Sequence, residues 1–277
     1  MTGTTLVLLL LAQAGTGWSG GIFVEPRSES LVYRFENPSR YDTSELVPHS
    51  FQQTYDTDNL WLGARAGHPF FKRRGRFEAA MSPAATRRAD DFDTFHQPDG
   101  NVIVTGTTGN ATLRGWRISD QVFLGSRKGV AFGLGYAHRH DHARFHDGDG
   151  ITTTAMPASV VHRLVTTRED TTSQLHVVSW IAETSRDVGR RGSFAVRADI
   201  APLARARLTV VLPDKYPGQR LVFDARIAAA SFGVRYAWMA GKWSVGAGAK
   251  AGRTFGWQRS ARMTLRSLSV SLDLQRH

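Results

Sequence analysis

Alternation of apolar residues with small or polar residues, at a period of two, is the strongest pattern in the chain. It is clear at residues 132–137, 194–201, 231–238, 243–250 and 267–274. Such alternation is typical of β-strands that have one apolar face and one polar or small face. We therefore predict an all-β protein.

The composition of the second face indicates what kind of β protein this is. It carries mostly Gly, Ala and Ser, with isolated charges. A soluble β-sandwich buries its apolar face and varies the charged residues outside, whereas small residues suit the crowded interior of a small barrel whose apolar side contacts lipid. Aromatic residues gather near strand ends, as in interfacial girdles: Tyr136, Trp180, Tyr236, Trp238, Trp243, Phe255 and Trp257.

Segment counting predicts a single antiparallel up-and-down transmembrane β-barrel of ten strands, with eight or twelve as alternatives. The strands are expected at 29–36, 51–67, 76–87, 109–124, 129–142, 172–184, 192–210, 219–238, 242–257 and 264–275. The connections alternate between short and long, and the longest predicted loops are 37–50, 88–108 and 143–171. Bacterial outer-membrane barrels have an even strand number, short periplasmic turns and longer external loops.

The N-terminus indicates export. Residues Leu6–Ala12 are apolar and are followed by Ala12-Gln13-Ala14, which has the form of a signal-peptidase site. The apolar run is shorter than the ~20 residues that a membrane-spanning helix needs. We expect a signal peptide at 1–14, a barrel at 15–277 and a location in the outer membrane.

Composition excludes several classes of function. The 277-residue chain has no cysteine, so disulfides, thiolate metal sites and thiol catalysis are excluded. Its net charge of +11 suggests nucleic acid as a partner, but the basic runs fall in separate short turns and form no continuous surface. We expect no nucleic-acid partner and no cofactor. The expected partners are outer-membrane lipid, the barrel-assembly machinery and small anions.

Charged residues on the predicted inner face are the first candidate functional group. They are Arg65, Glu78, Arg197, Asp199, Arg226, Arg235, Lys250 and Asp273. One interpretation is an ion-pair network that fills the interior, because an unpaired buried charge is costly. The other is a narrow pore that favours anions, as rings of Arg or Lys do.

A histidine-rich segment is the second candidate. His138, His140 and His142 share one face of a predicted strand, and a His-x-His pair can bind Zn²⁺. The same face carries Phe132 and Leu134, so these imidazoles are expected on the outside of the barrel, where a polar extension of the strand is the alternative.

The chain resembles bacterial outer-membrane β-barrel proteins as a broad class. Gly115-Trp116 and Gly133-Leu134-Gly135-Tyr136 are similar to segments of the omptin proteases, which place aspartates and an Asp–His pair at the external rim. Asp90, Asp91 and Asp93 lie in a suitable predicted loop, but Gln258–Arg262 contains no Asp-x-His.

Three functions follow as hypotheses. The first is a structural or narrow-pore barrel of the outer membrane. The second is a hydrolase active at the rim, either omptin-like or metal-dependent, although no catalytic triad is evident in the sequence. The third is a soluble secreted β-barrel that binds an apolar ligand, and it differs from the first two in burying its apolar face.

Overall fold

The computed structural model describes residues 19–39, 47–70, 73–96, 100, 102–155, 161–165, 168–211, 220–258 and 261–277. The predicted signal peptide lies outside these residues. The strands are β1 (Ser19–Ser39), β2 (Val47–Phe70), β3 (Arg73–His96), β4 (Val102–Arg127), β5 (Val130–Ala155), β6 (Val161–Val165), β7 (Glu169–Val188), β8 (Gly192–Val211), β9 (Leu221–Ala240), β10 (Trp243–Gln258) and β11 (Ala261–Arg276). No helix in this part of the chain is long and apolar enough to cross a membrane.

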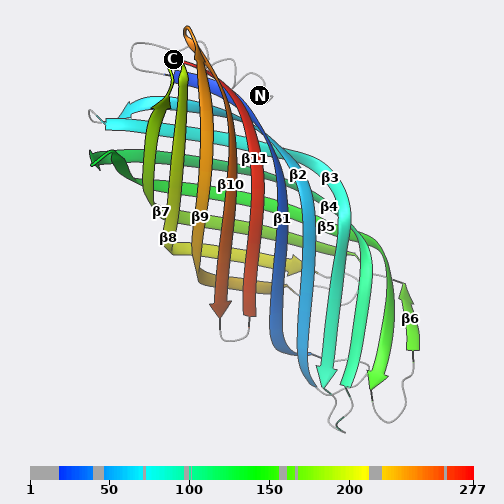
Figure 1. The fold of residues 1–277 in the computed structure, drawn as a ribbon. Coiled ribbons are helices and arrows are strands. Elements are labelled where there is room, and N and C mark those ends of the chain that lie inside the picture. Colours follow the sequence, from blue (N-terminus) through cyan, green and yellow to red (C-terminus); the bar gives the residue numbers. More distant parts are fainter. Residues whose placement is uncertain are drawn as a thin grey trace.

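Ten of the strands form a closed antiparallel barrel (Figure 1). Each strand pairs with its neighbours in the chain, β4 pairs with β5, and β1 closes the ring on β11. The short strand β6 lies outside the ring and extends the sheet from the far end of β5. The predicted all-β, up-and-down barrel of ten strands is confirmed, and the alternatives of eight or twelve strands are wrong.

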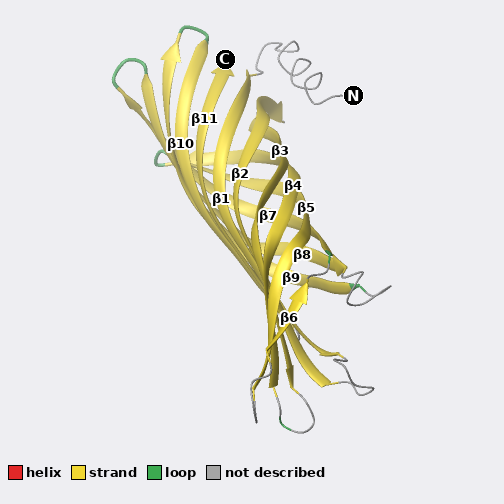
Figure 2. Ribbon diagram, turned by 90° about the vertical axis from the view of Figure 1, so that its right-hand side faces the viewer, coloured by secondary structure: helices red, strands yellow, loops and turns green. Residues whose placement is uncertain are grey.

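The two ends of the barrel differ. One end, here called the turn end, holds the tight connections at 128–129, 189–191 and 241–242 together with the C-terminus (Figure 2). Lys128 and Gly129 have φ angles of 51° and 79°, as a two-residue type I′ hairpin turn requires. The opposite end is called the loop end.

Several strands are longer than their sequence pattern predicted. The first strand begins at Ser19 rather than at residue 29, and most of the predicted loop 88–108 belongs to β3 and β4. Most of the described part of the predicted loop 143–171 likewise belongs to β5, β6 and β7. The missed residues of β1 lie at the turn end, whereas the predictions for β3, β4, β5 and β7 stopped early because the alternation changes its sense toward the loop end, as described below.

An apolar belt surrounds the outside of the barrel near the turn end. It comprises exposed large apolar side chains from each of the ten barrel strands, including Ile22, Leu62, Met81, Ile118, Leu134, Trp180, Ile200, Phe232, Val245 and Val270. A soluble barrel would bury such residues. Their exposure excludes the third hypothesis and is what a lipid-facing wall requires.

The inside of the barrel has two parts. Toward the turn end it carries charged and small polar side chains, as predicted. Toward the loop end it holds a continuous apolar core, of which the largest fully buried members are Tyr33, Tyr55, Phe145, Phe223, Leu208 and Met263.

Two β-bulges lie where this polarity changes. Two residues of β8 face one of β9 between the pairs Ala201–Ala229 and Ala204–Ile227. A similar extra residue interrupts β3 between Ser82 and Ala85. Both bulges contain a proline, Pro202 and Pro83, as is common where a strand lacks ladder hydrogen bonds.

Candidate functional site: the filled interior of the barrel

The charged side chains at the turn end of the interior form a continuous chain of ion pairs. In order of contact they are Asp141, Arg139, Glu29, Arg27, Glu25, Arg117, Glu78, Arg65, Asp273 and Arg235. Negative and positive groups alternate along it, five of each, so the chain is neutral as a whole.

Two arginines connect β1 to strands that are not its neighbours in the barrel. Arg139 on β5 donates hydrogen bonds from both terminal nitrogens to the carboxylate of Glu29 on β1, and the distance from Arg139 Nη2 to Glu29 Oε2 is 2.6 Å. Arg117 on β4 donates to Glu25 on β1 over 2.6 Å and to Glu78 on β3 over 3.1 Å. Bidentate guanidinium–carboxylate pairs of this kind are strong and also constrain the relative orientation of the two side chains.

An aromatic side chain stands in the middle of this ion-pair chain. Trp61 on β2 is fully buried, and the guanidinium carbons of Arg27, Arg117 and Arg139 lie 5.6, 5.1 and 5.1 Å from its ring centroid. Cation–π attraction is strongest over tryptophan and increases when the cation is desolvated. Trp61 therefore occupies the space between the arginines and contributes to binding them.

A second, smaller ion-pair group in the interior involves strands β3, β7, β8 and β10. Asp199 on β8 accepts a hydrogen bond from Arg197 over 2.9 Å and lies 3.3 Å from the Nζ of Lys250. Arg197 also donates to Gln121 on β4 over 2.6 Å. Glu183 on β7 joins Arg76 to this group, with an Nη1–Oε2 distance of 3.3 Å.

The apolar core at the loop end contains one buried polar contact across the barrel. The hydroxyl of Tyr33 on β1 donates to Glu169 on β7 over 2.8 Å, and that of Tyr55 donates to the same carboxylate over 3.1 Å. Burial and the Glu169 charge raise the pKa of both phenols, which therefore remain protonated donors. Strands β1 and β7 are five positions apart in the ring of ten, so this contact spans the interior.

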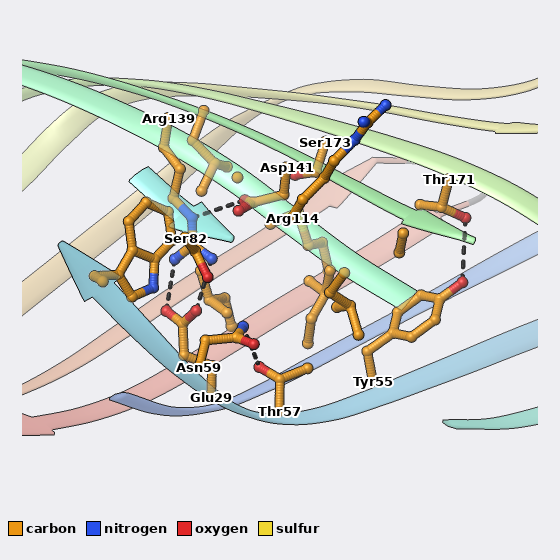
Figure 3. A pocket seen from close by; sticks show the side chains of 18 residues that line it. Glu29, Tyr55, Thr57, Asn59, Ser82, Arg114, Arg139, Asp141, Thr171 and Ser173 are labelled. Atoms are coloured by element: carbon orange, nitrogen blue, oxygen red, sulfur yellow. Dashed lines mark hydrogen bonds and ion pairs between the residues drawn. The ribbon is translucent and has the colours of Figure 1, made fainter. Parts of the chain in front are cut away.

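A small cavity of about 40 Å³ separates the two parts of the interior (Figure 3). Glu29, Arg139 and Asp141 lie on its polar side, and Tyr55 and Thr171 lie on its other side. A cavity of this size has room for only a few water molecules. It is too small to hold an organic substrate.

Seven of the eight predicted lumen residues point into the interior and are ion-paired there: Arg65, Glu78, Arg197, Asp199, Arg235, Lys250 and Asp273. Arg226 is a correction. It lies on β9 opposite the exposed Arg205, on the outer wall. Inward residues of β9 have odd numbers, as Phe223 and Ile227 do, so the even-numbered Arg226 must face outward.

Sequence analysis missed half of the interior charges. Glu25, Arg27 and Glu29 alternate in sign at every second residue, and of these only Glu29 lies in a predicted strand, as its first residue. Arg139 and Asp141 show the same spacing, as do Arg197 and Asp199. Opposite charges two residues apart on an otherwise small face are therefore the signal that identifies this interior.

The three histidines of the predicted metal site lie on the outer wall, as their position in the alternation requires, but they do not converge. His140 stacks on Trp116 with ring centroids 5.8 Å apart, and His142 approaches Asp170 at 3.8 Å. Among the residues that the structure describes, no three His, Cys, Asp or Glu side chains are grouped closely enough to bind a metal ion.

The aspartates that resemble omptin residues lie on strand β3 and not in a loop. Asp91 is buried in the interior, where its Oδ1 lies 3.1 Å from the amide nitrogen of Gln53 in that side chain's better orientation. Asp90 points the other way and accepts a hydrogen bond from Thr108. The two neighbouring carboxylates therefore cannot act together.

Comparison with known proteins relates the chain to barrels by fold and not by sequence. No family model matches it. The outer membrane protease OmpT of Escherichia coli superposes with a TM-score of 0.67 over 95% of this chain and 97% of its own, at 8% identity. The β-domain of the Bordetella autotransporter BrkA covers 93% of this chain and 99% of its own with a TM-score of 0.37, at 11% identity.

A match to a curated protein is short. The chain is 32% identical over 96 residues to β-ketoacyl-[acyl-carrier-protein] synthase III of Roseobacter denitrificans, which covers 33% of this chain and 30% of that protein. The chain thus spans less than a third of that relative's length, and no family follows from it. The predicted resemblance to outer-membrane β-barrel proteins is confirmed, the location in the outer membrane agrees with it, and the chain has the fold of that class.

Proposed function

We propose that this protein is a closed, structural barrel of the outer membrane and not a channel. The observation that carries the proposal is the contact of Tyr33 with Glu169 across the interior, inside an apolar core that fills the loop end. Ions that entered from the turn end would meet this core. A ten-stranded barrel lies between the packed interior of eight strands and the aqueous channel of sixteen or more, and here side chains fill it.

The pairing of the interior charges argues against an anion pore. The ten-membered chain is neutral, and most of its members are largely buried. Small anions would have to compete with carboxylates that already bind the arginines at hydrogen-bonding distance. The interior cations therefore rigidify the barrel and leave little positive charge for a permeating anion.

The length of the strands suggests what the barrel provides. Strands β2 to β5 have 24 to 26 residues, whereas crossing a bilayer takes about 9–11. The excess lies at the loop end, which by analogy with other barrels faces the outside. The protein would contact membrane lipid through the apolar belt, enter the membrane through the barrel-assembly machinery, and hold a rigid apolar-cored platform above the surface.

Planar-bilayer recording tests the proposal. The purified protein should insert without producing conductance steps, while a known porin in the same bilayers serves as the control for insertion. Its electrophoretic mobility should differ between boiled and unboiled samples, which shows that the inserted protein is a folded barrel. A reproducible open channel formed by the folded protein would contradict the proposal.

A further inference from the structure

Two imidazoles from neighbouring strands face each other on the outer wall of the barrel. His138 on β5 is directly opposite His176 on β7 in the strand register. Their Nδ1 atoms are 3.2 Å apart, and their ring centroids are 4.4 Å apart. The pair lies at the loop-end edge of the apolar belt, next to the exposed Ile118 and Val178.

We infer that His138 and His176 form a binding site for a divalent transition-metal ion. Zn–N bonds of about 2.0–2.1 Å at a tetrahedral angle place two ligand nitrogens about 3.3 Å apart. The observed separation of 3.2 Å fits that value. Neutral imidazole suits Zn²⁺, Cu²⁺ and Ni²⁺, which gives the chemical class of the ligand.

An oxygen donor lies beside the two nitrogens. The hydroxyl of Tyr136 is 2.9 Å from the Nδ1 of His176, so it lies next to the position that a shared ion would occupy. Tyr136 is on the outer face of β5, two residues before His138. Two nitrogens and this oxygen would leave one tetrahedral position open to water.

The indole ring of a tryptophan packs against one of the two imidazoles and restrains it. Trp116 on β4 packs against His138, with ring centroids 4.8 Å apart, and also stacks on His140. Side chains whose rotamers are held by packing make more accurate metal sites than free ones. The partner of His138 is thus an imidazole on the neighbouring strand, so the ion is shared across strands and not along the His138–His142 segment.

Metal titration of the folded barrel tests this site. The protein would be stripped with a chelator, kept in detergent, and titrated with Zn²⁺ by calorimetry and with Cu²⁺ by tryptophan fluorescence, because Trp116 contacts His138. One ion should bind per chain. His138→Ala and His176→Ala should each weaken binding at least ~10-fold, and Cu²⁺ bound to the unmodified protein should show an electron-spin signature of two nitrogen ligands.

The control is His142→Ala, which removes an imidazole from the same face of the same strand. It should change affinity less than ~2-fold. Heat-dependent mobility shows that each variant is folded, and His176→Gln keeps a polar side chain if the alanine variant fails to assemble. The inference is wrong if the unmodified barrel binds no Zn²⁺ or Cu²⁺, or if His142→Ala weakens binding as much as His176→Ala does.

Discussion

Arg139 and Glu29 are 110 residues apart in the chain, and they meet inside the barrel through two hydrogen bonds. Their strands, β5 and β1, are four positions apart in the ring of ten. The pair therefore crosses the interior and connects two distant parts of the wall. Both side chains are largely buried, at 15% and 3% exposure, so neither charge can be hydrated if its partner is lost.

Loss of either partner should destabilise the barrel strongly. Removing one member of a buried ion pair typically costs about 3–5 kcal/mol. We expect Arg139→Gln or Glu29→Gln to lower the free energy of unfolding by an amount of that order. Urea unfolding in phospholipid vesicles measures it. The double variant should lose less than the sum of the two single losses, because the contact between Arg139 and Glu29 is counted in both single losses.

The matched control is the pair of Arg205 and Asp224, which has similar geometry on the outer wall. Arg205 donates to Asp224 over 2.7 Å, but its side chain is 67% exposed. Exposed pairs contribute little to stability. If Arg205→Gln destabilised the barrel as much as Arg139→Gln, the interior pair would have no special role.

The alternation of residues was enough to predict the turn-end half of the barrel. At Phe194, Val196 and Ile200 the apolar residues face lipid, while Arg197 and Asp199 face inward. That pattern is typical of a membrane barrel and gave the correct class, strand number and inner face. The long-range pairing of the charges could not be predicted, because it depends on which strands lie opposite each other.

The loop-end half could not be predicted from the same rule because its polarity is reversed. In β8 the inward residues beyond the bulge are apolar, such as Leu208 and Val210, and the outward residues include Arg205 and Arg207. This is the arrangement of a soluble barrel. The predicted strand 192–210 covers this segment of β8, but the loop-end segments of β3 and β4 were predicted as the loop 88–108.

The lipid face gives a second prediction. Val270 lies in the middle of the exposed apolar row Leu268–Leu274 on β11. Val270→Arg should lower the free energy of unfolding in vesicles by about 2–4 kcal/mol, the usual cost of arginine near the bilayer midplane. Thr264→Arg, on the same face of the same strand but beyond the belt, should cost no more than about 1 kcal/mol. Equal costs would show that the belt is misplaced.

The pH dependence of stability at the loop end gives a third prediction. Burial acts to raise the pKa of Asp170, but hydrogen bonds from Arg144 and Arg168 outweigh it and hold the pKa below its ordinary value. A carboxyl with a lowered pKa stabilises the folded state at neutral pH, and this contribution is lost as the pH falls through the folded-state pKa.

Unfolding of the unmodified protein and of Asp170→Asn should therefore differ at pH 7, by no more than about 1 kcal/mol for a partly exposed group. The difference should shrink toward about pH 2, where the carboxyl is protonated in both states. A difference that grew on acidification would mean that Asp170 is stabilised in its protonated form.

The bulge in β8 gives the last prediction, because it determines which residues face the apolar core. Before the bulge the inward residues have odd numbers, such as Asp199, and after it they have even numbers, such as Ala206 and Leu208. Deleting Leu203 alone would remove the extra residue, restore an uninterrupted alternation and leave Arg205 and Arg207 facing outward. Deleting Pro202 and Leu203 together would shift the strand by one residue and turn the two arginines toward the core, since such a shift exchanges the two faces of a strand. We expect the double deletion to fail to form the heat-modifiable folded barrel and the single deletion to fold. Assembly of the double deletion at the level of the single deletion would show that the number of residues at the bulge does not set the orientation of the two arginines.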